Sequence, residues 1–324
     1  MLLSSMTPEF QRQIAQGTEH YELMRRLRYH SAIVVPLVAR RRALGTLSLL
    51  QMEGAHAYGQ DDLVLAEELA RRAALAIDNA RLFEATRHIA RTLQDGLLPR
   101  RLPEIPGARL AGRFLAAAQG QEVGGDFYDA FAIAENRWGI AIGDVCGKGP
   151  EAAALTALAR YTIRALADQD AATVLRRLND AVLRDDSDGA GRYLTGIFAT
   201  ASVDAGQLKL DLAVGGHPPP LVLRADGTVE RVPATGPLIG VTAEVRYLPA
   251  AVRLDPGDTL VLYTDGLTDA RAPRRILTDH GLAELLVSGL GLDPEDLAEL
   301  LERHATQGEK PRDDIALLVI RAEA

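Results

Sequence analysis

The 324-residue chain has the composition of an ordinary soluble protein, 47% hydrophobic and 25% charged, and is long enough for about two domains. Its formal net charge of -8 argues against nucleic acid as a partner, because binding to a phosphate backbone by counterion release needs clustered Lys and Arg. A single cysteine, Cys146, excludes an intramolecular disulfide and a multi-cysteine zinc site.

The beginning of the chain shows no targeting signal and no membrane span. The first residues, MLLSSMTPEF, lack a basic stretch followed by a long apolar run. The best apolar stretch, SAIVVPLVA at residues 31–39, is too short to cross a bilayer. We therefore expect a cytoplasmic protein with no membrane span.

Residues 31–53, SAIVVPLVARRRALGTLSLLQME, read as two strands joined by a basic turn. Helical spacing then continues over residues 61–98, with Asp61 and Asp62 at its favourable N-terminal end and Pro99 after it. Together these segments resemble the C-terminal half of a GAF domain with its exit helix. Because the upstream residues are too few for the rest of that fold, we expect a fragment, a mis-assigned start or a degenerate sensor, and predict no ligand for it.

The long helix carries two apolar seams, which suggest that it packs on its own domain first and on a partner helix later. One has a four-three spacing and the other recurs every seven residues: Leu69, Ala73, Ala76, Ala80 and Phe83, and Leu75, Leu82 and Ile89. A single amphipathic helix lying on a core is the simpler alternative, but the length favours a coiled-coil connector. We expect a homodimer through this helix, and expect the pairing to position the helix after GDVCGKGP so that Asp144 is competent for metal.

Beyond the helix, the proline-dense PRRLPEIPGARL at residues 99–110 reads as a linker. From about residue 108, short strands alternate with turns and helices, and DAGQ at residues 204–207 and DG at residues 226–227 are hairpin signals. Hairpins in the middle of the segment with helices outside them predict an antiparallel α+β sandwich.

Aspartates stand at the ends of several predicted strands, three of them beside glycine: Asp126, Asp144, Asp265 and the pair Asp313 and Asp314. Each taken singly is more simply a turn or capping residue. If the strand ends meet, however, the like charges are tolerable only with protonation or bound cations. Oxygen ligands of this kind suit Mg²⁺ or Mn²⁺, and adjacent glycines allow backbone carbonyls to approach as further ligands.

The order of motifs from residue 93 to 324 resembles the SpoIIE/RsbU-type phosphatases of the PPM (type 2C) superfamily. The resemblance is carried by EVGGDFYDAF, IGDVCGKGPEAA, GGHPPPLVL, GDTLVLYTDGLTDAR and DDIALLVIR. It implies an α+β fold, a PPM-type sandwich of two antiparallel β-sheets flanked by helices, with a binuclear Mn²⁺ or Mg²⁺ centre. It further implies hydrolysis of phosphoserine or phosphothreonine on a protein, typically a STAS-domain anti-sigma-factor antagonist, by a metal-bridging water.

The same resemblance implies roles for individual residues. Asp144 matches the aspartate that bridges both metals, and the Val145 carbonyl is a further ligand. The remaining metal carboxylates are matched by Asp126, Asp265 and Asp313, with Asp314 ranked below Asp313.

Four further residues have less specific expected roles. We expect Cys146 to be a small buried filler rather than a redox-sensitive thiol, and His217 to be a structural turn residue. Lys148 either meets the substrate phosphate or is a solvated loop lysine. Asp129 has no assigned ligand role and is expected to orient the ligand residues. The segment at residues 272–281, APRRILTDHG, departs from the family pattern and supports no prediction of specificity.

The predicted organisation is a partial GAF-like sensor at residues 1–82, a helical or coiled-coil linker at 83–106 and a phosphatase domain at 107–324. The alternative function is a non-catalytic binding module of the same fold that docks a STAS or anti-sigma kinase partner. The active phosphatase is favoured because a scaffold has no need of converging carboxylates, which cost stability without cations.

Overall fold

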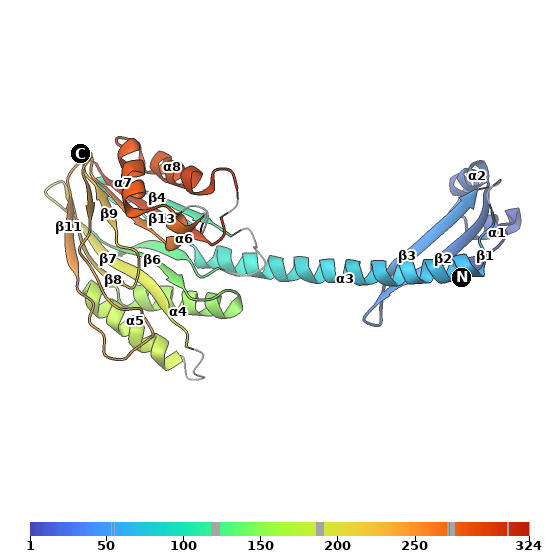
Figure 1. Ribbon diagram of the computed structural model, residues 1–324, viewed down its shortest axis with the longest axis horizontal. Helices are drawn as coiled ribbons and strands as arrows, with labels where there is room; N and C mark the ends of the chain where they lie inside the picture. Colours follow the sequence, from blue (N-terminus) through green and yellow to red (C-terminus); the bar gives the residue numbers. More distant parts are fainter. Residues whose placement is uncertain are drawn as a thin grey trace. The chain divides into compact units, whose positions relative to one another are not determined.

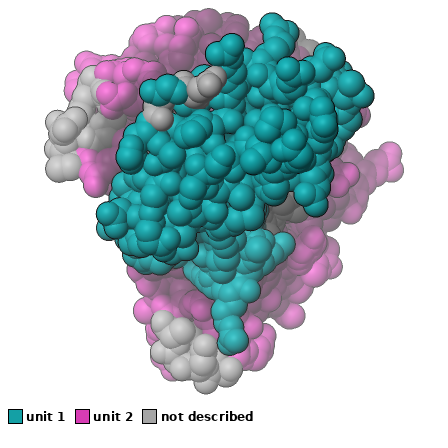
Figure 2. Space-filling model, turned by 90° about the vertical axis from the view of Figure 1, so that its right-hand side faces the viewer, with its two compact units in different colours: residues 1–86 teal, residues 87–324 magenta. Residues whose placement is uncertain are grey.

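The computed structural model describes residues 1–52, 54, 56–117, 124–185, 191–270, 272, 276–309 and 311–323, without the side chains of residues 86–95. Glu122 of the glycine-rich motif, part of the segment 272–281 and the side chain of Ile89 therefore lie outside the description. The chain divides into two compact units, Met1–Thr86 and Arg87–Ala324 (Figures 1 and 2). In the part described, no helix has both the length and the apolar character needed to cross a membrane.

Unit 1 is an antiparallel sheet in the order β1-β2-β3 with two short helices before its second strand. Its elements are β1 (Leu2–Leu3), α1 (Pro8–Ile14), α2 (Thr18–Leu27), β2 (Tyr29–Ala39) and β3 (Arg42–Met52). The two strands predicted within residues 31–53 are confirmed. Arg40 and Arg41 join them with φ angles of 46° and 67°, the positive values that a two-residue hairpin turn requires.

Helix α3 (Gln60–Leu97) matches the predicted long helix to within a residue at each end. Its buried stripe consists of alanines at every fourth residue, Ala66, Ala70 and Ala74. Ala66 and Ala70 pack against Ile33 and Val35 of β2, since a side chain this small allows helix and sheet to approach closely.

The predicted apolar seams of α3 are instead largely exposed. Leu69, Leu75 and Phe83 are 51%, 49% and 44% exposed, and Leu82 is 45% exposed. The expectation that one predicted seam packs on the helix's own domain is therefore wrong, because the alanine stripe fills that role.

Unit 2 contains two five-stranded sheets, in the orders β10-β9-β12-β13-β4 and β11-β8-β7-β6-β5. Every strand pair within them is antiparallel. Their strands are β4 (Ala108–Leu115), β5 (Phe127–Ala134), β6 (Arg137–Val145), β7 (Leu194–Asp204), β8 (Gln207–Gly215), β9 (Leu221–Leu223), β10 (Val229–Arg231), β11 (Ala250–Leu254), β12 (Thr259–Tyr263) and β13 (Ile315–Ala322). The predicted hairpin at DAGQ joins β7 to β8, and the one at DG joins β9 to β10.

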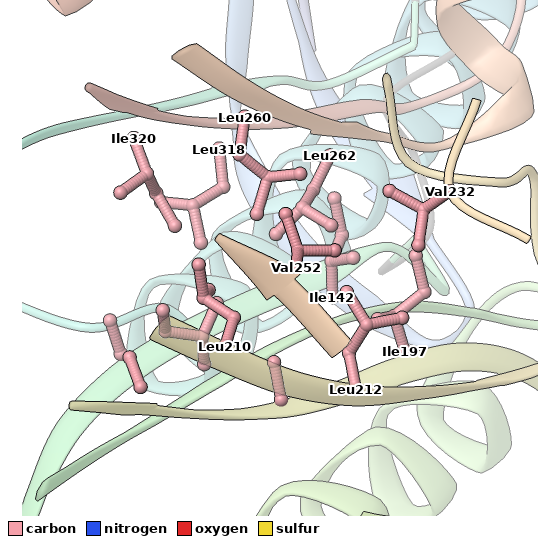
Figure 3. Packing of buried hydrophobic residues seen from close by; sticks show 14 of the residues in the cluster. Ile142, Ile197, Leu210, Leu212, Val232, Val252, Leu260, Leu262, Leu318 and Ile320 are labelled. Atoms are coloured by element: carbon pink, nitrogen blue, oxygen red, sulfur yellow. The ribbon is translucent and has the colours of Figure 1, made fainter. Parts of the chain in front are cut away.

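The main core lies between the two sheets (Figure 3). Ile142 and Leu210 face it from one sheet, and Leu260 and Leu318 face it from the other. Trp138 and Ile140 join this core from β6, as alternation along that strand predicts.

Two pairs of helices cover the outer faces, one on each side of the sandwich (Figure 1). The helices of the unit after α3 are α4 (Pro150–Leu166), α5 (Ala171–Asp185), α6 (Asp265–Asp269), α7 (Asp279–Ser288) and α8 (Pro294–Thr306). Helices α4 and α5 pack on the sheet that contains β5 to β8, and α7 and α8 pack on the sheet that contains β12 and β13. The predicted antiparallel α+β sandwich flanked by helices is thus confirmed.

Candidate metal centre

The candidate site lies where strand ends from both sheets meet. Asp126 directly precedes β5 and Asp144 lies near the end of β6, whereas Asp265 directly begins α6 after β12. Asp313 and Asp314 directly precede β13. The charges of Asp265, Asp313 and Asp314 all act on Asp144, so the aspartates predicted as metal ligands gather in one region from distant parts of the chain.

Three glycines let these segments approach closely. A Cβ atom on Gly124 would lie 1.2 Å from Asp314 Oδ2, and one on Gly266 would lie 1.8 Å from the backbone oxygen of Asp314. A Cβ atom on Gly125 would lie 2.1 Å from the carbonyl oxygen of Val145. No side chain fits at these three positions, so the glycines beside the aspartates provide clearance at the site.

Asp126 is almost completely buried and is held by Thr264, whose Oγ1 donates a hydrogen bond of 2.7 Å to Asp126 Oδ2. Thr264 is itself fixed by the strand ladder, because its Oγ1 accepts from Ala316 N at 2.9 Å. Burial, followed by the charge of Asp144, raises the pKa of Asp126 well above its usual range. Burial and the neighbouring charge thus both favour the protonated form of Asp126.

Asp144 and Val145 form the other side of the site. The backbone of Val145 is tied to Gly125 by a hydrogen bond from Val145 N to Gly125 O of 3.1 Å. Burial raises the pKa of Asp144 to about 6, assisted by the charges of Asp265 and of the aspartates before β13. Burial also raises the pKa of Asp265. Such shifts mark a place where positive charge would be strongly favoured.

Asp313 and Asp314 differ sharply despite being neighbours. Asp314 is buried; its Oδ1 accepts from Ala117 N at 2.7 Å, while its Oδ2 has no hydrogen-bond partner in the part of the chain that the structure describes. The Asp313 side chain is 62% exposed and pairs with Lys148 Nζ at 2.7 Å. Burial raises the pKa of Asp314. An unpartnered buried carboxylate oxygen is costly unless a cation or donor reaches it, so the geometry favours Asp314 as a ligand over Asp313.

The donor set suits a hard divalent cation. It consists of carboxylate oxygens and the carbonyl of Val145, without nitrogen or sulfur ligands. Across the described residues, however, no group of three or more His, Cys, Asp or Glu side chains is close-set enough to hold an ion as it stands. The fit to Mg²⁺ or Mn²⁺ therefore rests on the donor chemistry, the unpartnered Asp314 oxygen and the glycine clearance.

Asp129 serves a different purpose from its neighbour Asp126. It is 1% exposed and accepts hydrogen bonds from two arginines of α4, Arg160 and Arg164, at 2.8–3.2 Å. The Arg164 guanidinium also lies over the ring of Phe131, 4.5 Å from its centre. Asp129 thus fastens α4, the helix that follows the Asp144 loop, to the strand that begins after Asp126.

Cys146 lies at the surface, whereas His217 lies in the interior. Cys146 is exposed, so the expectation of a buried filler is wrong: the residue follows the last residue of β6 and has already left the core.

His217 is buried, and its Nδ1 lies 2.8 Å from Thr195 Oγ1. Its Nε2 has no hydrogen-bond partner among the described residues, and burial lowers the pKa of His217 to about 3. A neutral, buried His217 agrees with the predicted structural role.

Sequence reasoning missed Thr264, Arg160 and Arg164. Thr264 stands directly before Asp265 in YTDG, and a hydroxyl at the end of a buried strand was the available signal. The two arginines are four residues apart, so they share one face of α4, but nothing local indicates that Asp129 is their partner.

Solved structures share the fold of this sandwich. The SiaA-PP2C domain of Pseudomonas aeruginosa is 23% identical, with a TM-score of 0.62, over 76% of this chain and 100% of that one. The structure of the RsbU and RsbW domains of Rv1364c from Mycobacterium tuberculosis is 29% identical, with a TM-score of 0.58, over 69% of this chain and 62% of that one.

Two protein families match parts of the chain. Residues 134–323, more than half of the chain, match the family described as Stage II sporulation protein E (SpoIIE), and residues 3–77 match the GAF domain. The chain belongs to the SpoIIE family. Phosphoserine phosphatase RsbU of Bacillus subtilis (strain 168) is 28% identical over 219 residues, 67% of this chain and 58% of RsbU. The chain spans 33–58% of the length of the curated relatives compared with it.

Proposed function

We propose that this chain is a divalent-metal-dependent serine/threonine protein phosphatase of the cytoplasm. The observation that carries the proposal is the meeting of aspartates, with Asp126 and Asp314 buried, at one edge of a SpoIIE-family sandwich, where Asp314 Oδ2 has no hydrogen-bond partner among the described residues. A structural turn needs no such cluster, because burying several carboxylates together is unfavourable without cations.

In this proposal two ions of Mn²⁺ or Mg²⁺ are held by the Val145 carbonyl and by the carboxylates of Asp126, Asp144, Asp265 and Asp314. Asp313, at the exposed rim of the site, is a further ligand. When bound, such ions neutralise charge on phosphoryl oxygens and make water more acidic.

The chain's own residues prepare the site in several ways. Thr264 keeps Asp126 in place through a 2.7 Å hydrogen bond. Gly124, Gly125 and Gly266 leave room that any side chain would fill. Lys148 lies at the rim, 45% exposed and paired with Asp313, where its ammonium group is our candidate for contacting the substrate phosphoryl group.

We propose a phosphorylated STAS-domain protein as the substrate. The names of RsbU and RsbP of Bacillus subtilis (strain 168), both phosphoserine phosphatases, support phosphoserine as the group that is hydrolysed, and the STAS domain is what the resemblance of the motifs implies. A protein substrate also agrees with an open site, since Asp313 and Lys148 at its rim are both exposed by more than a third.

The test is release of phosphate from a phosphoserine STAS-domain protein with and without Mn²⁺. We expect Mn²⁺-dependent release by the wild type and a loss of at least about a hundredfold in Asp144→Asn. Asp211→Asn is the matched control, because Asp211 is an exposed residue of β8 outside the site, and it should retain full activity. Equal activity of the wild type and Asp144→Asn would refute the metal assignment.

The alternative function is a non-catalytic module that docks a STAS or anti-sigma kinase partner. It predicts binding of the partner by the wild type and by Asp144→Asn with no phosphate release from either. Absence of activity together with retained binding would therefore select this alternative.

We further propose a homodimer through α3. Leu75 and Leu82 are seven residues apart and about half exposed, which suits pairing with a second copy of the helix. Leu75→Glu should reduce the mass measured by light scattering from that of a dimer to that of a monomer, whereas Val241→Glu, at an exposed apolar residue of unit 2, should not. In our proposal the pairing also makes Asp144 competent for metal, so a fully active monomer would contradict it.

A further inference from the structure

A cavity of about 320 Å³ lies between α4 and α5, outside the metal centre. Thr162 and Leu166 line it from α4, one turn apart. Arg177, Ala181 and Arg184 line it from α5 and share one face of that helix. The small side chain of Ala181 between two arginines leaves open the space that a larger residue would fill.

The lining of this cavity is strongly basic. Arg176 also contributes, so three guanidinium groups face one carboxylate, that of Asp180. Three positive charges and one negative charge give a local charge of +2, in a chain whose formal net charge is -8. The positive charge of the cavity is therefore a local feature and does not follow from the overall composition.

The arginines of the cavity are also poorly compensated. Among the described residues none of the three has an ion pair or a side-chain hydrogen bond, although the charge of Asp170 acts at a distance on Arg176. Elsewhere in unit 2, Arg113 and Arg224 each pair with carboxylates. The cavity thus brings together guanidinium groups without the carboxylate partners that arginines usually have elsewhere in unit 2.

We propose that this cavity is a binding site for a small phosphate-bearing anion. Guanidinium groups offer paired donors that match phosphate oxygens, and the Thr162 hydroxyl adds another donor. The volume is near the lower end for small-molecule sites, which run from about 300 to 1,000 Å³. This size suits inorganic polyphosphate units or a nucleoside monophosphate.

The site does not depend on the proposed phosphatase activity. The experiment is calorimetric titration of the full chain with pyrophosphate and, separately, with AMP, in EDTA and low salt. EDTA removes divalent ions, so the aspartates of the proposed metal centre repel the added anion and binding there does not contribute to the signal.

We expect the wild type to bind at least one of the two probes, more tightly than sulfate. Binding of pyrophosphate alone would identify an inorganic ligand, and binding of AMP as well would identify phosphate esters. Arg177→Gln and Arg184→Gln should each weaken binding by about tenfold or more, and Arg177→Lys by less, because lysine keeps the charge but loses the paired donors. Arg246→Gln, at an exposed arginine outside the cavity, is the control and should bind as the wild type does.

Several results would overturn the proposal. These are no binding of either probe by the wild type, equal binding of sulfate, equal loss of affinity in Arg246→Gln, or unchanged affinity in both cavity variants. Tighter binding of an acidic peptide than of pyrophosphate, sensitive to Arg177→Gln, would replace the phosphate ligand with a protein one. Unfolding curves of the variants followed by Trp138 fluorescence would show that the fold is retained.

Discussion

Replacing Asp129 with alanine tests how firmly α4 is fastened to the strand that begins after Asp126. The wild-type carboxylate accepts four hydrogen bonds, two each from Arg160 and Arg164. The alanine variant leaves both guanidinium groups without this partner. Arg160 is only 7% exposed at its side chain, whereas Arg164 is 39% exposed and regains contact with water.

The expected loss follows from that difference in exposure. Removing one partner of a buried ion pair costs about 3–5 kcal/mol. Since Arg164 rehydrates, we expect the lower end, about 3 kcal/mol, for Asp129→Ala. Asp129→Asn keeps an acceptor but loses the charge, so about 2 kcal/mol is expected.

The assay is urea unfolding followed by tryptophan fluorescence. Trp138 is the only tryptophan of the chain and lies on β6, the strand paired with β5, so its signal reports unit 2 without a contribution from unit 1. Asp211→Ala, at an exposed aspartate of the same sheet, should change the free energy of unfolding by less than about 0.5 kcal/mol.

A second substitution makes the test sharper. Adding Arg160→Met to Asp129→Ala removes the stranded buried charge, so the double variant should be more stable than Asp129→Ala alone. The reasoning is refuted if Asp129→Ala loses less than about 1 kcal/mol, or if Arg160→Met gives no recovery.

Three further predictions concern the site and its surroundings. Asp314→Asn should raise the Mn²⁺ concentration for half-maximal phosphate release more than Asp313→Asn, because Asp314 is the buried one; the reverse order would contradict the assignment. Gly266→Ala places a Cβ 1.8 Å from a backbone oxygen and should destabilise unit 2 by about 1–3 kcal/mol or more, whereas Gly281→Ala, in α7, should be neutral or stabilising in the same unfolding assay. Burial lowers the pKa of His217 from 6.5 to about 3, so as the pH falls His217 is protonated in the unfolded chain before it is protonated in the folded protein. The free energy of unfolding therefore decreases as the pH falls below 6.5. Between pH 6.5 and 5 the wild type should lose about 2 kcal/mol more than His217→Gln, and equal losses would show that His217 is not held neutral.

The sandwich fold could be predicted because its strands are indicated by local patterns of the sequence. Alternation along RWGIAIGD placed Trp138, Ile140 and Ile142 on one face, and all three lie in the core between the sheets. The same alternation puts Asp144 at the end of that row, and the structure places it at the edge where the other aspartates lie.

Other features depend on contacts that no local pattern encodes. Asp129 and Arg160 are 31 residues apart, and only the packing of α4 on its sheet brings them together. Asp313 and Asp314 are chemically identical neighbours, so their opposite exposure follows from the direction in which the chain enters β13. On α3 the predicted seams contain the larger Leu69 and Phe83, yet the smaller Ala66 and Ala70 pack on the sheet because close approach favours small side chains.

The position of β13 has a consequence for synthesis of the protein. Although residues 315–322 are the last strand of unit 2 in the sequence, β13 lies inside its sheet, between β12 and β4. Strand β4 pairs only with β13, across eight residue pairs, so it has no partner strand until more than two hundred later residues have been made. Asp314 also arrives with β13. A ribosome-bound chain that has emerged only as far as residue 312 therefore lacks both the strand that pairs with β4 and the two aspartates that precede β13, so this sheet and the aspartate cluster are completed together.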